Sequence, residues 1–123
     1  MKFEDYLASV KRTCAGNVHD INVRFMNDVN LVHGAIGIST EAGEILDAVK
    51  KHVFYGKPID PINMKEELGD VLWYMALIAE HCGFTFDEAM QSNVSKLQKR
   101  FPEKFTEDQA INRNLDAEKE ALL

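Results

Sequence analysis

The sequence predicts an all-α protein built on two long antiparallel helices, with shorter helices on either side. Apolar residues recur at the three- and four-residue spacing of a helix over most of the chain, and no stretch alternates as a half-buried strand would. Glycine and proline interrupt this pattern at residues 56–58 and again at Gly83. The 123 residues, 46% hydrophobic and 28% charged, are typical of a single globular domain spanning residues 1–123. A chain of this length is expected to bury about two-thirds of the surface that it exposes when unfolded.

The N-terminal part contains one clear helix and one segment of undecided conformation. Residues 3–14 are expected to form an amphipathic helix, with Gly16 as its stop. Residues 17–27 have mixed periodicity, so their conformation stays open, with a partly helical segment as one alternative. The apolar face of the first helix consists of Phe3, Tyr6, Leu7, Val10 and Cys14.

The first long helix is expected over residues 28–54, where a broad apolar face repeats with helical spacing. It contains three glycines, Gly34, Gly37 and Gly43, and each costs roughly 0.5–1 kcal/mol relative to alanine. Either close approach of a second helix or room for a ligand would explain them. We favour room for a ligand, because Gly37 shares a face with acidic residues further along the helix.

The second long helix begins with a strong start signal, because Asp60 is a good N-cap and Pro61 suits the first helical position. It is expected to continue to about residue 81 and to end at Gly83. Its residues are apolar almost all round, which is typical of a central helix and not of a peripheral one.

The C-terminal part is expected to contain one firm helix and one weak one. Thr85 and Glu88 form a capping box, and the helix that they start should end near residue 101, before Pro102. A last helix is expected from Thr106 to the chain end, also with a capping signal. Because it has little apolar surface, we place the domain core at about residues 28–106 and expect the tail, residues 107–123, to pack on a partner subunit or to fray.

Each long helix carries a pair of carboxylates three residues apart, Glu41 with Glu44 and Glu67 with Asp70. Residues at this spacing share a helix face, so the four acids would meet if the two helices pack together. Such a concentration of negative charge needs a cation, and divalent ions that prefer oxygen ligands supply it. The sequence therefore predicts a metal site for Mg2+, with Mn2+ as the alternative.

Composition excludes several other classes of function. The net charge of −6 argues against a protein that binds nucleic acid through phosphate neutralisation.

No apolar run approaches the length of a membrane span, and the N-terminus lacks the pattern of a secretion signal, so we expect a cytoplasmic protein without membrane contact. Cys14 and Cys82 have no zinc or redox spacing and are expected to be free thiols.

The two acidic motifs resemble those of the MazG-type nucleotide pyrophosphohydrolases, whose signature is EExxE followed, after a loop, by ExxD. The resemblance covers about residues 28–106 and departs from the family pattern at Thr40, which stands where the family has its first glutamate. The segments that carry it are Thr40-Glu41-Ala42-Gly43-Glu44, Glu66-Glu67-Leu68-Gly69-Asp70, His33 with Gly34 and Gly37, Phe54-Tyr55-Gly56-Lys57-Pro58, and residues 93–102.

The resemblance implies metal-dependent hydrolysis of a nucleoside triphosphate between its α and β phosphates, giving the monophosphate and pyrophosphate. It implies Glu41, Glu44, Glu67 and Asp70 as metal ligands and catalytic groups, one of which orients or deprotonates the attacking water. The expected substrate-binding residues are His33, Tyr74, Asn93, Lys96 and Arg100. Lys96 and Arg100 suit phosphate, Asn93 suits phosphate or sugar, and Tyr74 or Trp73 suits stacking on a base.

The resemblance also implies a homodimer or homotetramer, with a four-helix core shared across a dimer. The residues favour the same arrangement, since the long helix pair has more apolar surface than its short flanking helices can cover. Two alternatives stay open: a non-enzymatic helical oligomerisation module with a structural cation site, and the same chemistry on a dinucleotide or alarmone. A ferritin-like di-iron protein is excluded, because neither long helix contains the required Glu-x-x-His pair.

Overall fold

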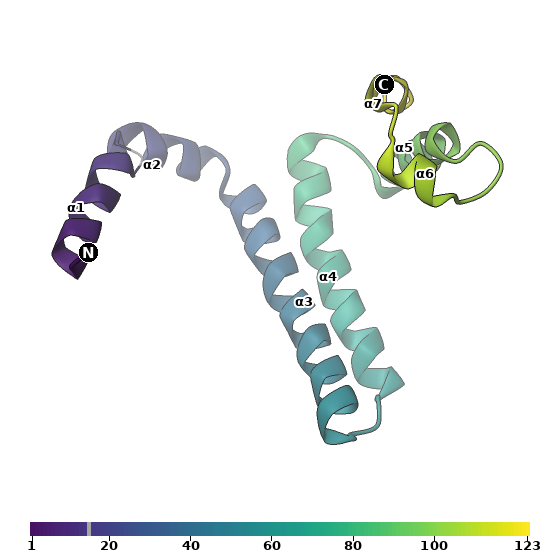
Figure 1. Ribbon diagram of the computed structural model, residues 1–123, viewed down its shortest axis with the longest axis horizontal. Coiled ribbons are helices and arrows are strands. Elements are labelled where there is room, and N and C mark those ends of the chain that lie inside the picture. The colour runs from purple at the N-terminus through teal and green to yellow at the C-terminus, as the bar shows by residue number, and fades with distance from the viewer. Residues whose placement is uncertain (15) are drawn as a thin grey trace.

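The computed structural model describes residues 1–14 and 16–123, and over these residues it is all-helical, as predicted. The two longest helices stand side by side as an antiparallel hairpin, and shorter helices extend from its open end (Figure 1). In chain order the helices are α1 (Phe3–Thr13), α2 (Val18–Asn27), α3 (Val29–Tyr55), α4 (Pro61–Cys82), α5 (Phe86–Arg100), α6 (Glu107–Ile111) and α7 (Leu115–Glu120).

A short connection, residues 56–60, joins α3 to α4, and the glycine and aspartate that end and start these helices are those predicted from the sequence. Gly56 ends α3 in the left-handed conformation, with φ 68°, and its N–H donates to the carbonyl of His52. Asp60 caps α4 by accepting a hydrogen bond from the N–H of Ile62, and Pro61 occupies the first turn. The predicted boundaries of both long helices are therefore confirmed to within one or two residues.

Gly34 and Gly37 are buried where α3 crosses closest to α4. A Cβ added at Gly37 would clash with the Tyr74 ring, and one added at Gly34 would lie 2.8 Å from Ile78 Cγ1. These two glycines therefore serve close helix approach, and the expectation that they make room for a ligand is wrong. Gly43 differs, because an added Cβ would meet no atom of another helix within 4 Å.

The N-terminal segment left open by the sequence is helical. Asn17 starts α2 by accepting a hydrogen bond from the N–H of Asp20, which explains why residues with mixed periodicity still form a helix. Asp28 separates α2 from α3, and its Oδ1 lies 3.1 Å from Nε2 of His81 at the end of α4. This contact connects the open end of the hairpin to the N-terminal helices.

The C-terminal part is more broken than predicted. The capping box of Thr85 and Glu88 is present, and Thr106 caps α6 by accepting from the N–H of Gln109. The expectation of one weak helix from Thr106 to the chain end is wrong, because α6 stops after Ile111. Asn114 then caps a separate helix, α7, by accepting from the N–H of Ala117. Helix α7 returns to pack on α5 of the same chain.

A single chain leaves most of its apolar side chains accessible to solvent. Its accessible surface is 10155 Å², whereas a compact monomer of 13.9 kDa exposes about 6,700 Å². Among the described residues Ala79 is the only buried hydrophobic one, while Phe54 and Ile62 are 77% and 78% exposed. The expectation that one chain buries two-thirds of its surface is therefore wrong; it buries about half. In the described part of the chain, no helix is long and apolar enough to cross a membrane.

Candidate metal centre

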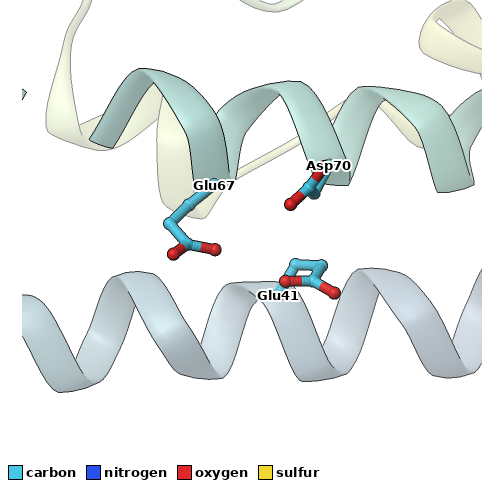
Figure 2. Close-up of side chains that lie close together, drawn as sticks. All are labelled: Glu41, Glu67 and Asp70. Carbon is cyan, nitrogen blue, oxygen red and sulfur yellow. The ribbon is translucent and has the colours of Figure 1, made fainter. Parts of the chain in front are cut away.

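Three carboxylates from the two long helices converge across the hairpin. Glu41 points from α3 toward α4, and Glu67 and Asp70 point from α4 toward α3 (Figure 2). Each of the three offers one oxygen atom that lies within 4.8 Å of the other two. Glu41 and Glu67 are partly buried, and Asp70 is exposed. The arrangement thus offers several oxygen ligands to a cation that enters from solvent.

The convergence depends on the close contact one helical turn away. Gly37 precedes Glu41 by four residues on α3, and Tyr74 follows Asp70 by four residues on α4. Since residues four apart share a helix face, the Gly37–Tyr74 contact lies on the same faces as the acids. The absent side chain at Gly37 lets the two backbones approach, and this approach brings the carboxylates of opposite helices within reach of one another.

The electrostatics of this cluster are unbalanced. The pKa of Glu67 is raised, first because the carboxylate loses contact with water and then because it faces the negative charges of Glu41, Glu44, Glu66 and Asp70. None of the ion pairs formed within residues 1–14 and 16–123 involves Glu41, Glu67 or Asp70. The three carboxylates therefore gather negative charge without an ion pair from the described residues, although Lys51 and Lys57 line the adjoining cavity with Glu67.

Glu44, the fourth predicted acid, does not join the group of three. It lines a neighbouring cavity of 230 Å³ near the α3–α4 connection, together with Glu67, Asn63 and Lys57. Three of the four expected acids thus lie within 4.8 Å of one another, and Glu44 lies on the adjacent wall, close enough for its charge to raise the pKa of Glu67. In the same region Asp47 pairs with Lys51, as its i, i+4 spacing predicts, and also with Lys50.

Aromatic side chains adjoin the acids on the side away from the connection. A cavity of 330 Å³ is lined by Glu41, Asp70, Trp73 and Tyr74. The rings of His33, Trp73 and Tyr74 contact one another edge to face, with centroids 5.0 to 6.2 Å apart. Of the expected substrate-binding residues, Tyr74 therefore lies beside the carboxylates, and His33 contacts the Tyr74 ring.

Trp73 also belongs to this aromatic group, although the sequence analysis listed only Tyr74 among the expected substrate-binding residues and left Trp73 as an alternative for base stacking. Tyr74 is partly buried over Gly37, whereas Trp73 remains 57% exposed at the cavity. The available signal was spacing, because Trp73 follows Asp70 by three residues and so lies on the same side of α4. Sequence spacing alone does not decide which of the two rings is anchored by the opposite helix.

The three expected substrate-binding residues of α5 lie apart from the acids. Asn93 and Lys96 line a separate cavity of 430 Å³ with Phe84 and Leu122. Arg100 is paired with Glu118 of α7. Helix α5 extends away from the hairpin that holds the carboxylates (Figure 1). One chain therefore brings Tyr74 to the candidate metal centre and His33 to the Tyr74 ring, and it places Asn93, Lys96 and Arg100 elsewhere.

Comparison with known proteins assigns this region to a described domain. Residues 35–105 match the MazG nucleotide pyrophosphohydrolase domain, and this range includes both acidic motifs. The chain is also 34% identical over 77 residues to the Gene 37 protein of Mycobacterium phage L5, a match that covers 57% of this chain and 65% of that protein. The chain thus spans slightly less than two-thirds of that relative, whose name states no activity. No solved structure was found to match.

Proposed function

Because this chain belongs to the MazG nucleotide pyrophosphohydrolase family, we propose that it hydrolyses a nucleoside triphosphate between the α and β phosphates. The products are the nucleoside monophosphate and pyrophosphate. The observation that carries the proposal is the convergence of Glu41, Glu67 and Asp70 within the matched residues. Clustered carboxylates that form no ion pair with the described residues, at a cavity also lined by Trp73 and Tyr74, suit a ligand that combines phosphates with a base.

The residues present fit a divalent cation. All three donors are carboxylate oxygens, which Mg2+ and Mn2+ prefer, and the raised pKa of Glu67 reflects negative charge that a cation would neutralise. We assign Glu41, Glu67 and Asp70 as ligands and Glu44, which lines the next cavity with Glu67, as the fourth. Once bound, such an ion lowers the pKa of a coordinated water and stabilises charge on the leaving pyrophosphate.

The neighbouring side chains would hold the rest of the substrate. His33, Trp73 and Tyr74 form a wall on which a base or sugar can pack, and Tyr74 is kept in place by its contact with Gly37. One carboxylate of the cluster orients the attacking water and accepts its proton. Lys96 and Arg100 contribute cationic donors to the phosphates, and Asn93 donates to phosphate or sugar.

The α5 residues reach the acids through a second copy of the chain. In one copy α5 lies away from the hairpin, and the hairpin exposes apolar side chains that a second hairpin would cover. The surface in excess of that of a compact monomer supports a shared helical core. We therefore propose a homodimer or homotetramer in which α5 of one subunit completes the site of another.

The proposal is tested by incubating the purified chain with Mg2+ and each common ribo- and deoxyribonucleoside triphosphate. Pyrophosphate and the matching monophosphate should appear in equal amounts, and EDTA should abolish their formation. Release of inorganic phosphate in place of pyrophosphate would contradict the assigned bond. Metal binding without turnover of any nucleotide, dinucleotides and alarmones included, would instead favour the structural oligomerisation module.

A further inference from the structure

Glu118 is a buried carboxylate in the C-terminal segment, and it is enclosed by two guanidinium groups. It lies on α7 and is 3% exposed. Its Oε1 accepts from Nε of Arg100 at 2.9 Å, and its Oε2 accepts from Nη2 at 2.8 Å. Nε and Nη2 of Arg113 donate to the same two oxygens. One acid is thus shared between two arginines, which leaves the group with a net positive charge.

The pairing holds Arg100 but does not use all of its donors. A guanidinium group has five N–H bonds. Arg100 donates to Glu118 only from Nε and Nη2. Within the residues that the structure describes, Nη1 of Arg100 donates to no protein acceptor. The Phe101 ring, whose centroid lies 5.8 Å from Cζ, further confines the group. Arg100 is therefore held through Nε and Nη2, while Nη1 keeps N–H groups that no described residue accepts; its side chain is 18% exposed.

The same segment builds the rest of the α5 face. Leu122, just beyond α7, lines the 430 Å³ cavity that also contains Asn93 and Lys96. All three residues that we expect to contact the substrate from α5 are thus in contact with the C-terminal segment or share a cavity with it. Glu118 and Arg113 lie outside residues 35–105, so this support is added to the matched family domain by residues beyond it.

We propose that Glu118 is a positioning residue, which holds Arg100 so that its free N–H groups contact a phosphate of the nucleotide. This inference rests on the proposed function, in which Arg100 is a phosphate contact. Glu118 could instead compete with the phosphate for Arg100. Because Glu118 is shared with Arg113, however, the two arginines and the glutamate together keep a positive charge, which favours a positioning role. The C-terminal segment is then part of the substrate site and not an accessory tail.

The test is a double-mutant cycle between Arg100 and Glu118, read by KM and kcat of pyrophosphate release. Glu118→Gln should raise KM about tenfold with little change in kcat, as expected when a contact group is misplaced by a fraction of an ångström. In the Arg100→Ala background the same change should have no further effect on KM. The matched control is Glu120→Gln, an exposed glutamate of the same helix, which should leave KM unchanged.

A second readout does not depend on turnover. Calorimetric binding of a non-hydrolysable nucleoside triphosphate with Mg2+ should weaken about tenfold in Glu118→Gln, and only in the presence of Arg100. If Glu118→Gln weakens nucleotide binding equally with Arg100 and with Arg100→Ala, Glu118 has only a structural role. The same holds if Glu118→Gln lowers the melting temperature without weakening nucleotide binding. Tighter binding in Glu118→Gln would show that it competes with the substrate. Absence of turnover in the unchanged protein would count against the proposed function and leave this binding test intact.

Discussion

Glu67 and Glu118 are both glutamates on helices, yet their neighbours shift their pKa values in opposite directions. At Glu67 the pKa is raised by loss of water contact and by the carboxylates around it. At Glu118 it is lowered far below its ordinary range, mainly by hydrogen bonds from Arg100 and then from Arg113. The chain thus supplies its own cations to one glutamate and further anions to the other.

This difference separates an acid that the chain pairs with its own cations from acids that form no ion pair with the described residues. The Glu118 carboxylate joins α5 and α7 of one chain, and its negative charge is paired with Arg100 and Arg113. The carboxylates of α3 and α4 oppose their own convergence, because like charges at this separation repel. An ion from solution would offset this repulsion, and it is this unbalanced charge that supports the proposed metal site.

The largest expected effect is loss of turnover when the unbalanced group is weakened. Glu67→Gln or Asp70→Asn should lower pyrophosphate release by more than about a hundredfold, since losing even a partner of a metal ligand costs roughly 10- to 100-fold. Helix content, measured by circular dichroism, should not change. Glu66→Gln is the matched control, because Glu66 is an exposed neighbour outside the group of three. Substantial turnover in both variants would remove the assignment.

The next effect is stabilisation by the ion itself. At a free Mg2+ concentration roughly a hundred times its Kd, the free energy of unfolding should rise by about 2.7 kcal/mol, because the ion binds the folded state only. Thermal denaturation with and without EDTA measures it. Glu67→Gln should lose this response, and Glu118→Gln should keep it. If Glu118→Gln abolishes the stabilisation by Mg2+ and Glu67→Gln keeps it, the ion does not bind at the carboxylates of α3 and α4.

A smaller effect tests the helix contact on which convergence depends. Gly37→Ala forces a Cβ against the Tyr74 ring and should lower the free energy of unfolding by about 1–3 kcal/mol. Gly43→Ala meets open space and should raise it by about 0.5–1 kcal/mol, because alanine favours the helix. Urea denaturation in the presence of EDTA measures the free energy of unfolding of both variants without a bound ion. Equal effects at both positions would mean that close approach at Gly37 does not hold the acids together.

Local sequence signals predicted much of this structure. Asp60 with Pro61, and Thr85 with Glu88, start helices where expected, because capping depends on neighbours in the chain. The i, i+3 acids share helix faces for the same reason. Spacing does not set the register between two helices, however, so it identified neither the Gly37–Tyr74 contact nor the separation of Glu44 from the other three acids.

The Glu118 group shows the same limit at longer range. Arg100 and Glu118 are separated by 18 positions and by two helix breaks, and no local periodicity connects them. The sequence therefore gave the tail no role in positioning Arg100. Prediction of such a contact requires the path of the chain between α5 and α7, which depends on how Asn114 starts the last helix.

The smallest effect is a difference between two pH midpoints. A raised pKa means that Glu67, without an ion, takes up its proton above the ordinary carboxyl value of 4.5, so stabilisation by Mg2+ should fade at mildly acidic pH. A lowered pKa means that the contribution of Glu118 is complete above about 4.5 and is lost only as the pH falls toward its depressed value. Hydrogen exchange of α7 amides should therefore stay slow at a pH where the melting temperature no longer responds to Mg2+. If α7 loses protection first, the two glutamates do not differ in the way that their neighbours indicate.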